Sequence, residues 1–277
     1  MKTLLRPKLN FEHPTPRTWR ILCLAVAAFV LAAPGNGQER EPYLPSERNG
    51  DETTITLLGL FVGGVAASSP WWAPPVVIQD DYSLQGSFPK YPYVEDHNGF
   101  QVLDDDVNAA ALHTGPFFVR AAADWGSDFE GTQRLGGSLH LETRRRWGVD
   151  AEWARYFTPA EGTVSRDHQF GDANVIVRFA QSKHAHWWTG GGFNWFDEQG
   201  ETDYAYNFTY GTDVCLGRPW VLSAQFDLGE IERQGFFRGR IQLGATWRGI
   251  EAFTGFDYLD HRDHHDGVLV AGLRAWF

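Results

Sequence analysis

From Pro116 to the C-terminus the sequence alternates between apolar and polar residues with a period of two, and the pattern recurs in ten segments. Such alternation is typical of a β-strand with two different faces. The segments are 117–125, 133–143, 147–157, 170–180, 186–196, 203–215, 220–229, 236–247, 250–259 and 267–277. Their lengths are close to the about 9–11 residues that a tilted strand needs to cross a bilayer core. The pattern therefore predicts an all-β domain over residues 116–277.

The connections between these predicted strands alternate in length. Every odd-numbered connection has at least six residues, and every even-numbered one has at most five. Short periplasmic turns and longer outer loops are typical of an up-and-down membrane barrel. A soluble sandwich with Greek-key crossovers would not produce this regularity. We therefore expect an up-and-down antiparallel transmembrane β-barrel of about ten strands, with both chain ends on the periplasmic side.

The last predicted strand, 267–277, ends on an aromatic residue at the carboxyl terminus. Counting back in steps of two gives a row of apolar residues: Phe277, Ala275, Leu273, Ala271 and Leu269. A terminal segment usually frays unless it is held in place. This segment resembles the closing strand of bacterial outer-membrane β-barrels, which ends in Phe and is recognised by the barrel assembly machinery. The resemblance implies a location in the cell outer membrane, with lipid and the assembly machinery as partners and these five residues as the assembly signal.

The N-terminus has the order of a secretory signal peptide. Basic residues precede an apolar run over 21–33, and small and polar residues follow it. The run is shorter than the about 20 residues that a transmembrane helix needs. We expect residues 1–37 to be removed, with cleavage near Ala33 or Gly37. Cys215 would then be the single cysteine, so no intramolecular disulfide is expected. The net charge is −11, and removal of residues 1–37 would make the mature protein more acidic, which argues against nucleic acid as a partner. We expect a monomer.

Residues 38–115 are expected to form an extended N-terminal segment, either periplasmic or docked in the lumen. The apolar stretch 53–67 fits an extra strand, an amphipathic anchor or a segment packed against the barrel. Residues 68–100 interleave proline with aromatic residues, and proline resists both helix and central strand. We therefore expect this part to be irregular. Its aromatic side chains indicate docking on the barrel, with a disordered linker as the alternative.

The two faces of the predicted strands carry different side chains. Aromatic residues near the strand ends of the outward face fit an interfacial girdle: Trp125, Trp147, Trp153, Trp187, Trp195, Trp220, Trp247 and Tyr258. Charged residues occupy the inward face. The predicted lumen network consists of Arg120, Glu142, Asp150, Glu152, Arg178, Asp213, Asp227, Arg238, Arg240, Glu251, Asp257 and Arg274. A ten-stranded barrel is little wider than one that side chains fill, so we expect a packed network rather than a general diffusion pore.

Two rim segments are candidates for chemistry. The predicted last outer loop contains imidazole and carboxylate groups that suit a divalent metal: Asp260, His261, Asp263, His264 and His265. Adjacent residues on a flexible loop rarely give a preorganised site, so a solvated polar loop is the favoured interpretation. In the longest predicted outer loop, an Asp167 and His168 pair could activate water. This arrangement loosely resembles the outer-membrane omptin proteases in strand number and in acidic and His residues at the rim, although no omptin motif matches residue by residue.

Two classes of function stay open at this point. One is a non-enzymatic outer-membrane barrel with a structural role or a narrow, plugged transport role. The alternative is a surface-exposed hydrolase, omptin-like or metal-dependent, that uses the His and Asp groups at the outer rim. The glycines at 190–192 indicate close strand packing rather than a phosphate loop, because no helix follows them. The sequence predicts no cofactor.

Overall fold

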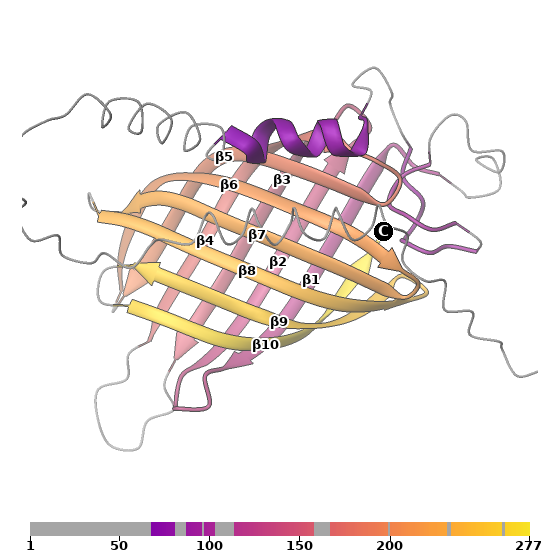
Figure 1. Cartoon of the computed structure of the whole chain (residues 1–277). Coiled ribbons are helices and arrows are strands. Elements are labelled where there is room, and N and C mark those ends of the chain that lie inside the picture. Colours follow the sequence, from indigo (N-terminus) through magenta and orange to yellow (C-terminus); the bar gives the residue numbers. More distant parts are fainter. Residues whose placement is uncertain are drawn as a thin grey trace, which may run out of the picture.

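The structure, a computed structural model, describes residues 68–80, 87–95, 97–102, 114–157, 167–198, 200–231, 234–261 and 264–277. Within these residues, ten antiparallel strands close into one barrel (Figure 1). The strands are β1 (Phe117–Ser127), β2 (Gln133–Thr143), β3 (Trp147–Phe157), β4 (His168–Gln181), β5 (Ala185–Glu198), β6 (Glu201–Gly217), β7 (Trp220–Ile231), β8 (Gln234–Trp247), β9 (Ile250–His261) and β10 (His264–Trp276).

Each strand pairs with its neighbours in sequence, and β1 pairs with β10 to complete the ring. The closing register runs from Arg120 opposite Trp276 to Ser127 opposite Leu269. The backbone of Phe277 exchanges two further hydrogen bonds with Val119, so the chain is held to its last residue. The predicted up-and-down barrel is therefore confirmed. In the described part of the chain, no helix is both long and apolar enough to cross a membrane.

The predicted strand cores are correct, but the alternation of loop lengths is wrong. β2 and β3 have the predicted bounds, whereas β5 to β10 extend further at the ends that were predicted as outer loops. Glu198 pairs with Glu201, for example, so a predicted six-residue loop becomes a tight hairpin. The reason is that ladder hydrogen bonds join backbone groups and need no apolar side chain. Polar strand ends therefore continue past the apolar band.

The side chains divide as the alternation predicts. Outward positions carry exposed apolar groups, and inward positions fill the lumen in three layers. We call the end of the barrel that contacts residues 87–102 the cap end, and the opposite end the far end. A hydrophobic cluster lies at the cap end and includes Phe118, Val221 and Trp276. A second hydrophobic cluster lies at the far end, and charged and polar groups lie between the two.

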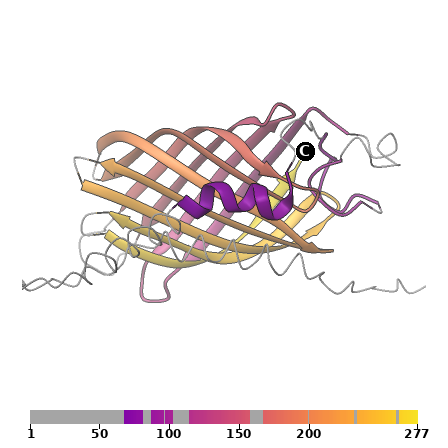
Figure 2. The same ribbon diagram turned by 45° about the horizontal axis from the view of Figure 1, so that its top comes forward.

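Residues 68–78 form a helix, which corrects the prediction of an irregular segment. The helix lies on the outside of the sheet (Figure 2). Gln79 takes a left-handed conformation (φ 55°), and the Asp80 N–H donates to the Pro75 carbonyl at 3.0 Å. This is the hydrogen bond of a Schellman-type helix end. An interior proline costs a helix about 3 kcal/mol, and contacts with the barrel wall offset this cost.

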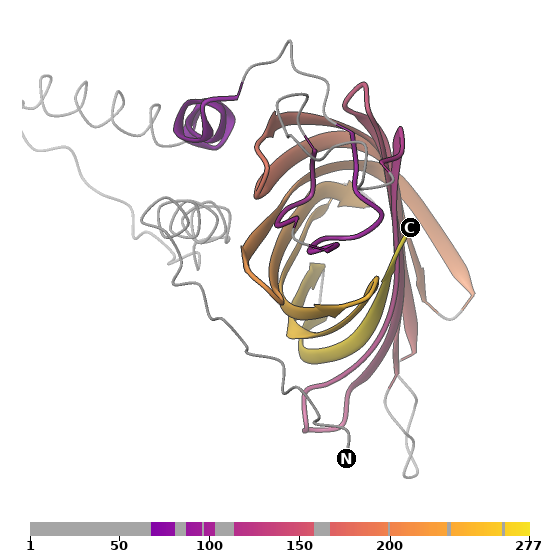
Figure 3. The same cartoon turned by 90° about the vertical axis from the view of Figure 1, so that its right-hand side faces the viewer.

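Residues 87–95 and 97–102 lie across the mouth of the barrel at the cap end, shown in purple in Figure 3. Ser87 bridges to Val102, and the Phe100 N–H donates to the carbonyl of Lys183 at 2.9 Å. The Tyr93 hydroxyl donates to the Trp220 carbonyl at 2.5 Å. We call residues 87–95 and 97–102 the cap. The predicted stretch 53–67, residues 38–52 and the predicted signal peptide 1–37 lie outside the described residues.

Candidate functional site

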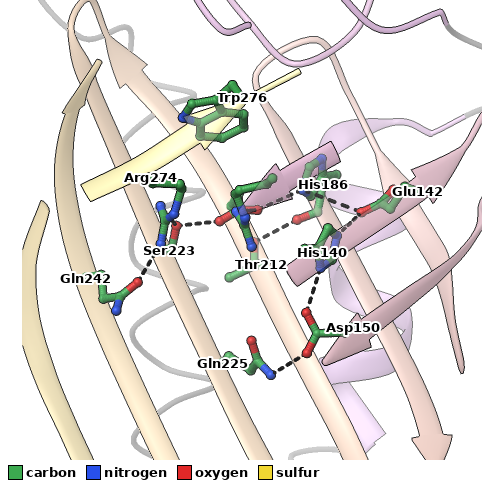
Figure 4. Close-up of polar contacts among 12 residues, drawn as sticks. His140, Glu142, Asp150, His186, Thr212, Ser223, Gln225, Gln242, Arg274 and Trp276 are labelled. Atoms are coloured by element: carbon green, nitrogen blue, oxygen red, sulfur yellow. Dashed lines mark hydrogen bonds and ion pairs between the residues drawn. The ribbon is translucent and has the colours of Figure 1, made fainter. Parts of the chain in front are cut away.

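The candidate site is the polar layer in the middle of the lumen, part of which is drawn in Figure 4. All twelve residues of the predicted lumen network lie there, supplied by strands around the whole ring. Eleven are buried, and the Arg240 side chain is 12% exposed. The alternation of side chains along each strand places these residues inside the barrel, and the closure of the ring brings them within reach of one another.

The first group in this layer is centred on His140 of β2. One ring nitrogen lies 2.8 Å from Asp150 Oδ1, and the other lies 2.7 Å from Glu142 Oε1. Glu142 also forms an ion pair with Arg178 of β4. An imidazole between two carboxylates is held in one orientation, because both of its nitrogens are engaged. This group joins β2, β3 and β4 through charge-assisted contacts.

The second group is centred on Asp213 of β6. Its carboxylate accepts hydrogen bonds from Arg120 Nη1 and Ser223 Oγ, each at 2.5 Å, and lies 3.0 Å from His186 Nε2. The chain of contacts continues through Arg274, whose Nη1 donates to Ser223 Oγ at 3.2 Å and to Glu251 Oε1 at 2.7 Å. Although Ser, His and Asp meet here, the serine bonds to the aspartate rather than to the histidine. The arrangement is not that of a nucleophilic triad, in which histidine accepts the serine proton.

The third group, nearer the far end, is centred on Glu152 of β3. Glu152 accepts from Arg134 at 2.8 Å, from Arg238 at 2.5 Å and from Arg240 at 2.6 Å. Arg134 also pairs with Asp124, and Arg238 lies 2.8 Å from Asp257. One carboxylate therefore joins strands from opposite sides of the ring.

Two carboxylates in the layer differ from the rest. Asp172 and Asp227 are 0% and 3% exposed, and within the described residues neither forms an ion pair. Asp172 Oδ1 accepts from Asn174 Nδ2 at 2.8 Å, whereas Asp172 Oδ2 has no hydrogen-bond partner. Asn207 Nδ2 donates to Asn174 Oδ1 at 3.1 Å and to Asp227 Oδ1 at 3.3 Å. Amide groups therefore supply part of the stabilisation that arginines supply elsewhere.

A cavity lies between the first two groups and is lined by residues that include Arg120, His140, Asp150, Arg240 and Arg274. Its free space is about 10 Å³, which is about what one water molecule needs. Beyond this space, the two hydrophobic clusters close the lumen at the cap end and at the far end. The geometry supports a sealed and internally paired lumen.

Arg134, His186 and Asp172 belong to the network but were not predicted from the sequence. Each is buried and each occupies an inward position of its strand. They alternate with outward-facing apolar residues along their strands, and this alternation could have identified them as inward-facing. The structure also explains the glycines of β5, because a methyl group at Gly190 or Gly192 would overlap backbone atoms of β4.

The predicted pair Asp167 and His168 is not brought together as an acid–base dyad. Asp167 accepts from Arg155 Nη2 at 2.7 Å in an exposed contact. His168 is buried, its ring stacks on Tyr156 at 4.9 Å, and its Nε2 lies 3.1 Å from Asp266 Oδ2. The two neighbouring side chains therefore face different environments.

The segment 260–266, predicted as a loop, is instead a strand hairpin. β9 ends at His261 and β10 begins at His264, while Asp263 lies outside the described residues. His261 is fully buried and contacts Phe196 at 4.8 Å. Asp260 and His265 contact each other at 2.9 Å on the other face. Strand alternation divides the cluster, and no group of three or more described His, Cys, Asp and Glu side chains could hold a metal ion.

The outward residues of the closing strand and of the predicted girdle are largely exposed. Leu269, Leu273 and Phe277 are more than half exposed. Among the predicted girdle residues, Trp195 and Tyr258 are partly buried, and Trp187 is fully buried. It is 1% exposed and belongs to a cluster of wall residues against which Ile78, from the external helix, is packed.

Comparisons with solved structures find partial likenesses among bacterial barrels. The Yersinia pestis outer membrane protein Ail in a phospholipid bilayer nanodisc aligns with 59% of this chain and 100% of its own, at 10% identity and a TM-score of 0.34. Neisserial surface protein A (NspA) aligns with 59% of this chain and 98% of its own, at 14% identity and a TM-score of 0.31. The KdgM porin aligns with 58% of this chain and 99% of its own, at 10% identity and a TM-score of 0.27. No protein-family model matches the chain, and no curated protein sequence matches it.

Proposed function

We propose that this protein is an outer-membrane β-barrel with a non-conducting lumen and a structural role in the membrane. The observation that carries the proposal is the filling of the lumen. Ion-paired side chains occupy its centre, and hydrophobic clusters occupy both ends. General porins have about 16 strands and an aqueous channel. A ten-stranded barrel filled by its own side chains leaves no path for a hydrated solute.

The outer wall supports a lipid environment. Its exposed side chains include Leu135, Leu139, Val149, Val175, Phe193, Leu228, Leu243, Phe256, Leu269 and Leu273. An apolar surface that continues around a barrel far exceeds the patches of a few hundred Å² that soluble monomers expose. In a bilayer the same side chains face the lipid hydrocarbon, so their apolar surface is not exposed to water.

Aromatic residues at two levels support the same placement. Trp147, Trp220 and Trp247 lie at strand ends beside the cap, and Trp125, Trp153 and Tyr204 lie toward the far end. Such rings favour the interfaces on the two sides of a membrane. We place the cap in the periplasm, where an even number of strands returns both ends of the barrel domain. Outer-membrane lipid and the barrel assembly machinery are the partners that this proposal implies.

The location is tested by fractionation of the native protein, followed by gel migration with and without heating. We expect the protein in the outer-membrane fraction, with a folded form that migrates differently from the heated form. Recovery of the folded protein in a soluble fraction would contradict the proposal.

The closed lumen is tested by single-channel recording in planar bilayers. We expect no steady conductance for the full-length protein. Removal of residues 38–115 should also leave the bilayer closed, because side chains of the barrel itself fill the lumen behind the cap. Steady conductance of the full chain would refute a structural barrel. Conductance that depends on the removal would instead indicate a transport barrel plugged by its N-terminal segment.

A further inference from the structure

The helix over residues 68–78 lies on the face of the barrel that the proposed function assigns to lipid. The ring of Trp71 packs against three aromatic residues of this wall, at centroid distances of 6.0 Å to Phe179, 5.8 Å to Phe208 and 5.5 Å to Tyr210. Phe208 and Tyr210 are near the middle of β6. The first described turn of the helix is therefore close to the middle of the barrel wall.

The other end of the helix is fixed at the cap end of the barrel. The Asp80 carboxylate accepts two hydrogen bonds from Arg146, in the turn between β2 and β3, at 2.7 and 2.8 Å. It also accepts the Gln181 N–H at 3.0 Å. A two-pronged arginine–carboxylate contact fixes orientation as well as position. The helix thus spans from the middle of the wall to its rim.

Proline makes the docking specific. Pro74 has no N–H to donate to the carbonyl four residues earlier, so the Pro70 carbonyl is left without its usual helical donor. The Tyr210 hydroxyl donates to this carbonyl at 2.7 Å. An unsatisfied backbone group costs several kcal/mol in hydrocarbon, and a neighbouring element that supplies the missing bond makes a proline tolerable there.

The face of the helix turned away from the barrel is apolar. Trp72, Val76 and Val77 are 48%, 67% and 42% exposed. No charged residue stands between Glu52 and Asp80 in the sequence. A helix on a water-exposed surface carries polar residues on its outer face. An outer face made of tryptophan and valine matches the neighbouring wall, where Val175 is 56% exposed.

We propose that the helix 68–78 is embedded in the bilayer, where Tyr210 and Arg146 hold it to the barrel wall and where Trp72, Val76 and Val77 contact lipid acyl chains. The inference rests on the proposed membrane location of the barrel. It assigns to the N-terminal segment a membrane-embedded part, separate from the cap.

The test places a spin label on single cysteines in the full-length protein with Cys23 and Cys215 replaced by alanine. The labels replace Val76 on the helix, Val175 on the wall and Phe129 in the exposed turn between β1 and β2. Collision rates with oxygen and with a water-soluble nickel chelate are measured in phospholipid liposomes. We expect the collision rate with oxygen to exceed that with the nickel chelate at Val76 and Val175, and the nickel chelate to give the higher rate at Phe129.

The controls separate the two proposals. A higher collision rate with the nickel chelate than with oxygen at Val175 would overturn the membrane location itself. Oxygen access at Val175 with nickel access at Val76 would overturn only the embedding of the helix. Low access of both reagents at Val76 would show a protein partner on the helix, such as a second copy, and would also overturn lipid contact.

The docking bond is tested by Tyr210→Phe, with Tyr206→Phe as the matched control on the same face of β6. Tyr206 is 63% exposed, and its hydroxyl lies 3.5 Å from Glu230. We expect Tyr210→Phe to raise the mobility of the label at Val76, and Tyr206→Phe to leave it unchanged. Equal spectra for both variants would overturn the role assigned to Tyr210.

Discussion

Glu152 and Asp172 offer a sharp test of how the lumen is stabilised, because they are direct partners across β3 and β4. Both are buried carboxylates, at 4% and 0% exposure. Glu152 accepts from three arginines, whereas Asp172 has no ion pair within the described residues. The same chemical change, from carboxylate to amide, should therefore act in opposite directions at the two positions.

Glu152→Gln removes the negative charge that three guanidinium groups share. Arg134 and Arg238 keep Asp124 and Asp257, but Arg240 keeps only a 3.3 Å contact with Gln225. Removal of one partner from a buried ion pair costs about 3–5 kcal/mol. With an m-value of about 2 kcal/mol per M urea, the unfolding midpoint should fall by about 1.5–2.5 M.

Asp172→Asn should stabilise the protein. The new amide oxygen retains the hydrogen bond from Asn174, and the substitution removes a buried ionisable group that forms no ion pair within the described residues. A buried polar group without its partner costs about 1–3 kcal/mol, and more where it can carry a charge, so the midpoint should rise by about 0.5–1.5 M urea.

The assay is urea unfolding in liposomes near neutral pH, followed by tryptophan fluorescence and by the gel migration of unheated samples. The two signals report tertiary packing and barrel closure separately. A fall in the midpoint of similar size for both variants would refute the reasoning, since it would mean that the lumen responds to any loss of charge and not to the pairing of each carboxylate.

Three further outcomes are expected. Gly192→Ala should abolish refolding into the heat-modifiable form, because the added methyl group would overlap the Ala173 carbonyl. Gly191→Ala should refold normally, because the nearest atom to its added methyl group is 3.4 Å away. Burial raises the pKa of Tyr93, so docking of the cap should be fully stable below the ordinary tyrosine pKa of about 10 and should weaken as the pH rises above it. Protection of the cap from proteolysis measures this docking, and Tyr93→Phe should remove its pH dependence. An unchanged pH dependence in the variant would assign it to another group. His168→Ala should lower the free energy of unfolding by about 1–3 kcal/mol, because it removes a buried ring from its packing. His265 is 62% exposed, so His265→Ala should leave the urea midpoint unchanged. Equal effects of the two variants would contradict the buried position of His168 and the exposed position of His265.

Much of the fold was predictable because the alternation of side chains along a strand is local. A period of two assigns each residue to the lumen or to the wall without any knowledge of its partners. This is why Glu152 and Arg238 could be placed inside the barrel and Leu273 outside it from the sequence, and why the number of strands and the closing strand were correct.

The tertiary structure alone decided which groups meet. Glu152 contacts Arg238 across 86 positions of the chain, and Tyr210 reaches Pro70 across 140. Such contacts depend on the register and curvature of the closed sheet, which a local pattern does not encode. The same holds for the rim, where Asp167 and His168 are adjacent in sequence but separated by the wall of the barrel. It holds also for the helix over residues 68–78, since proline disfavours that helix locally and the barrel wall supplies the packing and the hydrogen bond that stabilise it.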